Sequence, residues 1–410
     1  MVRPERRTRG DLIAAAAIAA VVAVVIAMFW WHSSARATTF RPASTPAPDL
    51  KAPQAVPAAL QQRWNAPSAK TPAPVIAGGT VVTGDGREMT GRNPETGEQR
   101  WLYGRDRDLC GVSYVYDLAV AVYPDVRGCG QVSSVKSGTG QRGPTRTSYA
   151  DKQTVVSSNG SAVLSYGPTR LELWRSDLVR LLSYGEIDAR IKPVNVGLGK
   201  GCTLMSAAAS DATAAVLEVC PDSNELRLNL LKPAKEEDEP DSKQVKLDGL
   251  PIDSDARVLV VSGTTAAVYL PTPRPQVAVY DETGTKVSET PLRVAPGPGA
   301  TVPAVTRAGD YITWWTGSAV MVFDDKLSYR YTIDGTGPLA PLGPAAMMAG
   351  KLLVPVAGGL AVFDPASRSQ ERIIAVEHPP GMSAVVPGVI GTMVIEQRGQ
   401  ALTGYSPAAN

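Results

Sequence analysis

A unit of short strands and tight turns recurs along most of this chain, and this repeat constrains the fold more than any other feature. Clear copies cover residues 77–103 and 349–367, where apolar strands alternate with turns rich in Gly, Asn, Asp and Pro. Weaker copies cover residues 158–174, 262–284 and 308–325. Matching glycines lie about 41 to 46 residues apart, which is the period of propeller blades with four strands each. The repeat therefore predicts an all-β fold, a β-propeller.

The propeller is expected to occupy residues 59–407 and to have eight blades, with seven as the alternative. The predicted blades are 74–103, 111–148, 153–184, 202–248, 257–293, 302–333, 345–376 and 382–405. The last unit lacks a fourth strand, but Gln62-Arg63-Trp64-Asn65 resembles Gln99-Arg100-Trp101-Leu102 in the first unit. We therefore expect Arg63 and Trp64 to lie on the missing outer strand, which leaves no open edge in the ring. The alternative is that Trp64 lies in the linker.

One apolar segment precedes the repeats. Leu12–Trp31 contains no charged residue and has the length, about 20 residues, that crosses a bilayer as a helix. Residues 1–11 carry Arg3, Arg6, Arg7 and Arg9, so this end should stay in the cytoplasm, with Trp30 and Trp31 at the outer interface. The alternative is a signal peptide cleaved near Ala35-Arg36-Ala37. Either way, the rest of the chain should lie outside the cytoplasm, in the first case as a single-pass protein of the cell membrane.

Residues 32–58 are rich in Ala, Pro, Ser and Thr, a composition that favours extended conformations without a core. They are predicted to form a stalk that lifts the propeller off the membrane. The net charge of +2 gives no general electrostatic case for nucleic-acid binding. Two histidines, His32 and His378, leave little room for chemistry based on imidazole.

Four cysteines are predicted to form two structural disulfides, because an even number in an exported chain is typical of such bridges. Cys202 and Cys220 are equidistant from a turn near residue 211, so they should face each other across a hairpin. Cys110 and Cys129 flank the corresponding hairpin of the second unit. Metal binding is the alternative, but no C-x-x-C pair exists and no histidine lies near, so no metal is expected.

The first unit contains Gly-Thr-Val-Val-Thr-Gly-Asp-Gly, then Asn-Pro-Glu-Thr-Gly-Glu and Arg-Trp. It resembles the repeat of quinoprotein-type (PQQ-like) β-propellers, and the overall plan resembles membrane-anchored actinobacterial proteins with such repeats. The resemblance covers roughly residues 60–407 and implies an eight-bladed ring. Dehydrogenases of this group hold a quinone against adjacent cysteines, with a calcium ion. No two cysteines are adjacent here, so no cofactor and no catalytic residue is predicted.

Two segments are candidates for partner binding. The first contains Trp174, Arg175 and Asp177, because Trp and Arg are enriched at binding hot spots. For Trp174, packing within the blade is the competing interpretation. The second is an acidic run that includes Glu236, Glu237 and Asp238, which reads as a solvated loop, a docking site or a weak calcium site.

The expected function is a non-catalytic scaffold that binds another protein of the cell envelope. The first alternative is recognition of a glycan or other envelope polymer in the central funnel. The second is a quinone-dependent dehydrogenase, which the missing ligand set disfavours. These hypotheses stay open because fold alone does not fix function.

Overall fold

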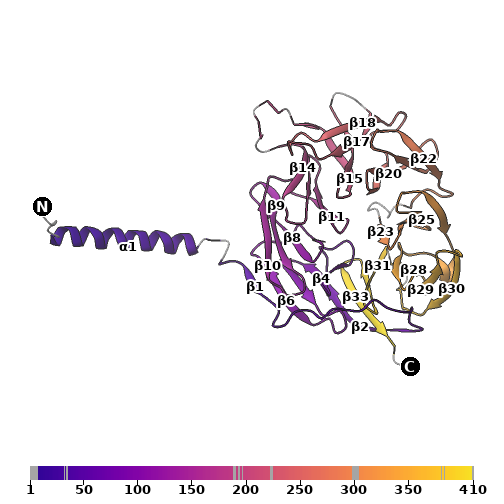
Figure 1. Cartoon of the computed structure of the whole chain (residues 1–410), viewed down its shortest axis with the longest axis horizontal. Coiled ribbons are helices and arrows are strands. Elements are labelled where there is room, and N and C mark those ends of the chain that lie inside the picture. Colours follow the sequence, from indigo (N-terminus) through magenta and orange to yellow (C-terminus); the bar gives the residue numbers. More distant parts are fainter. Residues whose placement is uncertain are drawn as a thin grey trace.

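A computed structural model describes the chain except residues 1–7, 32, 34–35, 188–190, 193, 196, 222–224, 298–303, 380, 383 and 409–410. Arg3, Arg6, Arg7, His32 and Ala35, which entered the prediction of an anchor or a cleavage site, lie outside the described residues. Helix α1 (Arg9–Trp31) is followed by a ring of β-sheets (Figure 1). None of its residues is buried, and its length and composition suffice to cross a membrane. A signal sequence near the amino terminus would meet the same criterion.

Eight antiparallel sheets form the ring, so the prediction of eight blades is confirmed and the alternative of seven is excluded. Blade 1 contains β3 (Val75–Ala77), β4 (Thr80–Asp85), β5 (Glu88–Arg92) and β6 (Gln99–Gly104), with β1 (Thr39–Arg41) added on β6. Blade 2 contains β7 (Gly111–Val115), β8 (Leu118–Asp125), β9 (Gly128–Lys136) and β10 (Arg142–Thr147). Blade 3 contains β11 (Val155–Ser158), β12 (Val163–Tyr166), β13 (Arg170–Trp174) and β14 (Arg180–Gly185). Blade 4 contains β15 (Thr203–Ala209), β16 (Ala214–Val219), β17 (Leu226–Lys232) and β18 (Asp241–Lys246).

The second half of the ring repeats this plan. Blade 5 contains β19 (Arg257–Ser262), β20 (Thr265–Leu270), β21 (Gln276–Tyr280) and β22 (Lys286–Pro291). Blade 6 contains β23 (Ala304–Ala308), β24 (Tyr311–Trp315), β25 (Val320–Asp324) and β26 (Tyr329–Ile333), followed by the short helix η1 (Gly337–Leu339). Blade 7 contains β27 (Ala346–Met348), β28 (Lys351–Val356), β29 (Gly359–Asp364) and β30 (Ser369–Ile374). Blade 8 contains β31 (Val385–Ile390), β32 (Met393–Arg398), β33 (Ala401–Pro407) and β2 (Leu60–Pro67).

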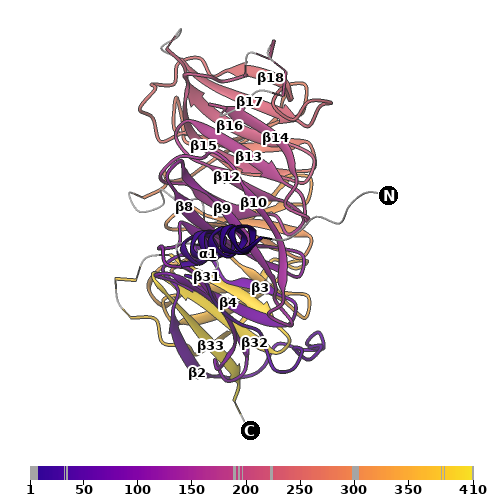
Figure 2. The same ribbon diagram turned by 90° about the vertical axis from the view of Figure 1, so that its left-hand side faces the viewer.

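The first strand of each blade lies at the centre of the ring and the fourth at its rim. First strands of neighbouring blades contact one another, as β7 does with β3 and β11. Fourth strands such as β18 and β22 are largely exposed. Figure 2 shows the ring from the side, with the sheets of blades 2 to 4 stacked on one another.

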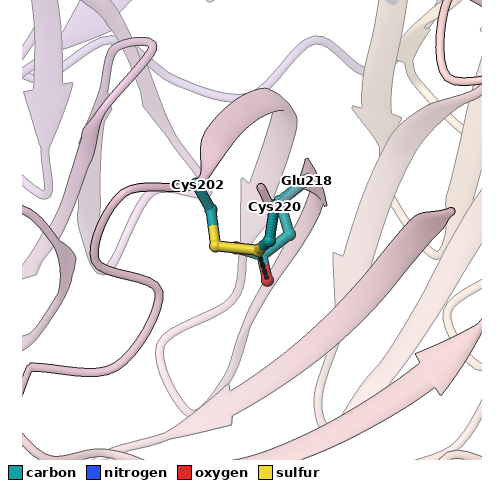
Figure 3. A group of neighbouring side chains, drawn as sticks. All are labelled: Cys202, Glu218 and Cys220. Atoms are coloured by element: carbon teal, nitrogen blue, oxygen red, sulfur yellow. Dashed lines mark hydrogen bonds between the residues drawn. A yellow bond between two sulfur atoms is a disulfide. The ribbon is translucent and has the colours of Figure 1, made fainter. Parts of the chain in front are cut away.

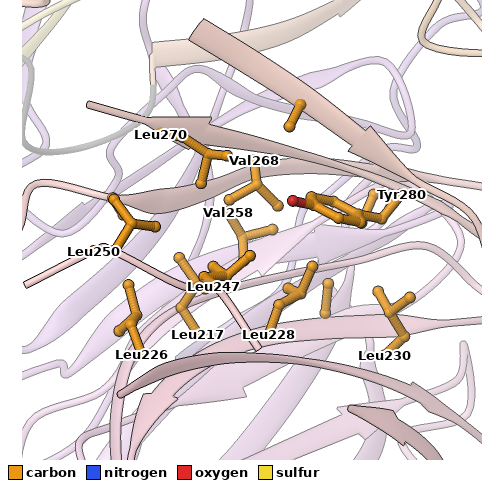
Figure 4. Packing of buried hydrophobic residues seen from close by; sticks show 14 of the residues in the cluster. Leu217, Leu226, Leu228, Leu230, Leu247, Leu250, Val258, Val268, Leu270 and Tyr280 are labelled. Atoms are coloured by element: carbon orange, nitrogen blue, oxygen red, sulfur yellow. The ribbon is translucent and has the colours of Figure 1, made fainter. Parts of the chain in front are cut away.

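The hydrophobic core lies between the sheets. Between blades 4 and 5, for example, Leu217 and Leu228 pack against Val258, Val268 and Tyr280 (Figure 4). Each fully buried Leu or Val contributes about 1.5–3 kcal/mol. Because the middle strands have neighbours on both faces, they are continuous apolar runs rather than alternating ones.

The ends of the ring close where the sequence predicted. Strand β2 pairs with β33, with Trp64 opposite Gly404 and Arg63 left exposed at a β-bulge. Trp64 Nε1 donates a hydrogen bond of 2.8 Å to the carbonyl of Pro94 in blade 1. Trp101 does the same one blade further, donating over 2.6 Å to the carbonyl of Ser137 in blade 2.

Each of these tryptophans lies on a glycine of the neighbouring strand. A Cβ atom on Gly404 would come within 2.3 Å of the Trp64 ring, and one on Gly91 within 2.1 Å of the Trp101 ring. Only glycine therefore leaves room for the indole in both places. Trp64 thus joins blades 8 and 1 by the same device that joins blades 1 and 2.

The predicted stalk is wrong for most of residues 32–58, because this segment lies on the propeller. Strand β1 pairs with β6, and the amide of Ala47 donates to the carbonyl of Gly138 over 2.7 Å. Leu50 packs against blade 8 and Val56 against the core between blades 7 and 8. The composition misled because a few apolar side chains among many prolines suffice to hold an extended segment on a surface.

Both predicted disulfides are confirmed. Cys202 and Cys220 flank the first two strands of blade 4, next to the paired residues Thr203 and Val219, with Cα atoms 4.1 Å apart. Cys110 and Cys129 also form a bridge, with a Cα distance of 6.0 Å, but not across one hairpin. Cys110 directly precedes β7, and Cys129 lies in β9. This bridge therefore links two strands that are not neighbours, because β8 lies between them in the sheet.

Candidate interaction face

The ring has two faces that differ in the loops they carry. Because successive strands are antiparallel, the turns between first and second strands and between third and fourth strands lie on one face, named here the turn face. The loops between second and third strands and the connections between blades lie on the other, the connection face. Side-chain hydrogen bonds join neighbouring blades on the turn face. Ser210 donates to the carbonyl of Gly263, and Ser262 to that of Asp325, each over 2.6 Å.

Aspartate or asparagine begins four of the turns between third and fourth strands. Asn93, Asp281, Asp324 and Asp364 each accept hydrogen bonds through Oδ1 from at least two backbone amides that follow, over 2.8–3.3 Å. Such side-chain bonds replace the backbone pairing that a turn lacks. The ammonium of Lys351 also lowers the pKa of Asp364 to about 2. These four turns of the turn face therefore have fixed conformations.

Carboxylates are exposed on the turn face around most of the ring. They come from the turns of blades 1 to 6 and comprise Glu95, Glu98, Asp117, Asp177, Asp211, Glu282, Asp310 and Asp325. Exposed basic groups in the described turns include Arg175, which pairs with Asp177 at 2.5 Å, Lys235, Lys326 and Arg368. Glu282 also pairs with Lys232 at the end of β17. The described turns therefore present a surface dominated by negative charge.

The predicted interaction residues of blade 3 separate into two environments. Trp174 is only 1% exposed, so it packs within the blade and is not a surface hot spot. Arg175 and Asp177 lie in the exposed turn between β13 and β14, and the bond from Arg175 lowers the pKa of Asp177 to about 2.

Trp174 contacts Glu172, a residue that the sequence analysis missed. Its Nε1 donates to Glu172 over 2.8 Å, and Arg146, Arg170 and Arg180 surround the same carboxylate at 2.5–3.2 Å. Burial alone would raise the pKa of Glu172, but the three guanidinium groups outweigh it and hold this pKa below its ordinary value. The sequence did contain a signal for this residue, because Glu172 stands between Leu171 and Leu173 in an apolar strand.

The acidic run between β17 and β18 folds back onto blade 3. The amide of Ser183 donates to the carbonyl of Glu237 over 2.6 Å, so the run covers the outer edge of β14. Glu237 pairs with Arg180, and Glu236 pairs with Lys192 at 2.6 Å. The run therefore brings one of its glutamates next to the cluster around Glu172.

Asp238 contradicts the interpretation of this run as a solvated loop. It is only 2% exposed and accepts bonds of 2.9 Å from the amide of Ile191 and from Asn195. Partner binding by Glu236, Glu237 and Asp238 stays a prediction, and the structure shows their carboxylates engaged within the chain.

A second buried ionic cluster joins blades 7 and 8. Glu396 is fully buried and accepts hydrogen bonds from Arg398, the shorter 2.5 Å long. It also lies 3.2 Å from Nε2 of His378. The other ring nitrogen of His378 lies 2.7 Å from the carbonyl of Val356. This cluster holds the connection that contains His378 against the interior of the ring.

One group of side chains has the composition of a metal site. Cys202, Glu218 and Cys220 place their sulfur and oxygen atoms within 4.8 Å of one another (Figure 3). The two sulfurs are bonded to each other, whereas a metal binds the thiolate form. Glu218 accepts hydrogen bonds from Tyr184 and Asn229 over 2.9 and 2.7 Å. This arrangement fits a structural disulfide with a buried polar network, not a metal site.

The family resemblance raises the question whether a quinone and a calcium ion bind at the centre of the ring, where the inner strands would supply the ligands. Within the described first strands, only Arg257 and Arg307 carry charge. A calcium ion takes six to eight oxygen ligands, usually with carboxylates among them. The residues that line the centre of the ring do not fit this requirement.

A polar cleft of about 480 Å³ opens on the turn face between blades 6 and 7. Its lining comes from two turns of blade 6 and the adjoining residues of β24, β25 and β26, and from one turn of blade 7. The lining residues are Asp310, Tyr311, Asp324, Asp325, Arg330, Tyr331, Pro365, Ala366 and Arg368.

Comparisons with known proteins support the fold alone. No protein-family model matches the chain, and no curated protein matches it. Among solved structures, the chain is similar to Sqt1 of Saccharomyces cerevisiae, with a TM-score of 0.52 and 11% identity over 88% of this chain and all of that one. It also matches AztD from Citrobacter koseri (TM-score 0.42, 13% identity, 80% of this chain and 98% of that chain). A third match is BBS1N in complex with ARL6DN (TM-score 0.39, 12% identity, 87% and 99%).

Proposed function

We propose that this chain is a membrane-anchored scaffold outside the cytoplasm, whose turn face binds a basic envelope protein. The observation that carries the proposal is the set of exposed carboxylates that six blades present on one face. One turn in each of blades 1, 3, 4, 5 and 6 contains side-chain hydrogen bonds to backbone amides. These bonds limit the conformational entropy that the turns lose when a partner binds. A partner rich in Lys and Arg complements this charge, which speeds association and excludes acidic competitors.

Three features support the location. Helix α1 is long and apolar enough to anchor the chain. The two disulfides favour an oxidising compartment. Only residues 32–38 separate the end of α1 from strand β1 on the ring, and these residues span at most about 25 Å when fully extended. An anchored propeller therefore lies close to the bilayer instead of on a long stalk.

The other candidate functions have less support. Polymer binding in the central funnel would use the inner strands, whose described side chains are mostly small and apolar. A dehydrogenase would need ligands that these strands do not offer. We propose no catalytic role.

Charge reversal on each face tests the proposal. Asp117, Asp211 and Glu282 are exposed on the turn face, and Asp248, Asp253 and Asp255 are exposed in one connection on the other face. The full-length chain is extracted from native membranes in detergent and its co-purifying proteins are identified. We expect the triple change to Lys on the turn face to abolish recovery of the partner, and the matched D248K/D253K/D255K variant to retain it. Equal recovery with both variants contradicts the proposal.

A further inference from the structure

The cleft between blades 6 and 7 carries charges that no other described residue neutralises. Among the described residues, the carboxylates of Asp310 and Asp325 have no hydrogen bond or ion pair. The guanidinium of Arg368 has a single described contact, the face of the Tyr331 ring, with 5.7 Å to the ring centroid. Arg330, by contrast, pairs with Asp324 at 2.8 Å.

The unneutralised charges are arranged by sign. Asp310 and Asp325 belong to the two turns of blade 6, and Arg368 belongs to the turn of blade 7. Asp325 is held in place because its carbonyl accepts the bond from Ser262. Lys326 follows Asp325 but does not line the cleft. A ligand therefore meets negative charge on the blade 6 wall and positive charge on the blade 7 wall.

The uncharged part of the lining suits a small organic ligand. Tyr311 and Tyr331 contribute aromatic side chains to the lining, and Pro365 and Ala366 add apolar surface. The hydroxyl of Tyr331 is buried without a hydrogen-bond partner among the described residues. The volume of about 480 Å³ lies within the range of small-molecule sites.

We infer that this cleft binds a zwitterionic ligand of the amino-acid or short-peptide class. Its ammonium group lies between Asp310 and Asp325, close to the face of Tyr311, where carboxylates and an aromatic ring both attract a cation. Its carboxylate accepts hydrogen bonds from the guanidinium of Arg368, whose planar donor pair matches a carboxylate. The inference goes beyond the scaffold role, because ligand binding and partner binding can fail separately.

Blocked dipeptides test each wall of the cleft. Titration calorimetry on the full-length chain in detergent compares alanyl-alanine with its N-acetylated form, which lacks the ammonium, and its amidated form, which lacks the carboxylate. We expect each blocked form to bind at least about tenfold more weakly, the loss expected for one charge-assisted hydrogen bond. Free alanine as a further probe distinguishes a single amino acid from a peptide as the source of this chemistry.

Two variants should lose opposite halves of this selectivity. D310N/D325N should bind alanyl-alanine no better than its N-acetylated form, while still rejecting the amidated form. Arg368→Gln should show the reverse pattern. Asp248→Asn, at an exposed aspartate on the connection face, is the matched control and should behave as the unaltered chain. Equal binding of all three dipeptides, or no binding of alanyl-alanine at about 10 mM, overturns the inference.

Discussion

Glu172 is the residue on which most charge interactions of blade 3 converge. Its carboxylate is almost fully buried and is held by three arginines and the indole of Trp174. Removing one partner from a buried ionic cluster leaves the remaining charges uncompensated, which costs far more than losing an exposed pair.

We predict that Glu172→Gln lowers the free energy of unfolding by about 3–5 kcal/mol, because three guanidinium groups lose their buried counter-charge. Asp177→Asn, which breaks only the exposed pair with Arg175, should cost less than about 1 kcal/mol. Urea unfolding of both variants at neutral pH measures the difference. Equal costs would show that Glu172 does not organise the cluster.

The stabilisation from Glu172 should also depend on pH. Its pKa in the folded chain lies below the ordinary value of 4.5. A lowered pKa means that the stabilisation is fully present above 4.5 and is lost as pH falls through the folded-state pKa. The gap in unfolding free energy between the unaltered chain and Glu172→Gln should therefore be constant from about pH 7 to 5 and shrink below that range. A gap that widens on acidification would contradict the sign of this shift.

At the scale of single residues, the sequence predicted those whose environment is set by near neighbours. The cysteine pairing between residues 202 and 220 follows from one hairpin. Glu172 was missed because its arginines come from three different strands, β10, β13 and β14, which only the folded blades bring together. For Trp174 the sequence left packing and partner binding open, because burial depends on the neighbouring blade.

At the scale of elements, strand β2 is decisive because it joins residues near the amino terminus to the last blade. Its pairing with β33 turns an open row of sheets into a closed ring. The side chain that completes the joint is Trp64, which reaches blade 1.

We predict that Trp64→Ala lowers the unfolding free energy by about 3–5 kcal/mol, the usual cost of removing a buried aromatic side chain. It should also expose residues 59–67 to proteases. Trp101→Ala is the matched control, because it removes the same side chain from an equivalent joint between blades 1 and 2 that the chain itself connects. If Trp101→Ala exposes residues 59–67 equally, β2 is not a separate closing element.

The closing pair can also be locked. Asn65 and Thr403 are register partners, and their side chains are joined by a hydrogen bond of 2.9 Å. We expect N65C/T403C to form a disulfide that raises the midpoint of thermal unfolding, with the gain removed by a reducing agent. N65C alone is the control. A pair that stays reduced under oxidising conditions would contradict the register.

The elements themselves were predictable because tight turns and short apolar strands are local signals. The closing strand was predictable because residues 62–65 copy residues 99–102. The position of residues 39–58 was not predictable, because an extended proline-rich segment has the same composition whether it is solvated or packed on a surface. Its place depends on distant groups such as Arg372, which donates to the carbonyl of Val56 over 2.8 Å.

At the scale of the whole molecule, the ring separates a turn face rich in carboxylates from a connection face of longer loops. This separation follows from the repeat, because the same turn positions fall on the same face in every blade. An acidic polymer would be repelled by the turn face, and a basic protein would be attracted to it.

The strength of partner binding should therefore depend on salt. We predict that the association rate falls as ionic strength rises from about 0.05 to 0.5 M, while the dissociation rate changes less, because exposed charges act mainly on encounter. Surface plasmon resonance with the purified partner measures both rates. An association rate that does not respond to salt would contradict electrostatic recognition by this face.

The most direct test of the scaffold role is photo-crosslinking in native membranes. A photoreactive amino acid is placed in turn at Asp117, Asp211 and Glu282 on the turn face, and at Asp248, Asp253 and Arg274 on the connection face. The proposed function predicts that the turn-face positions capture one common basic protein and that the connection-face positions do not. Capture of that protein from the connection face alone would contradict it.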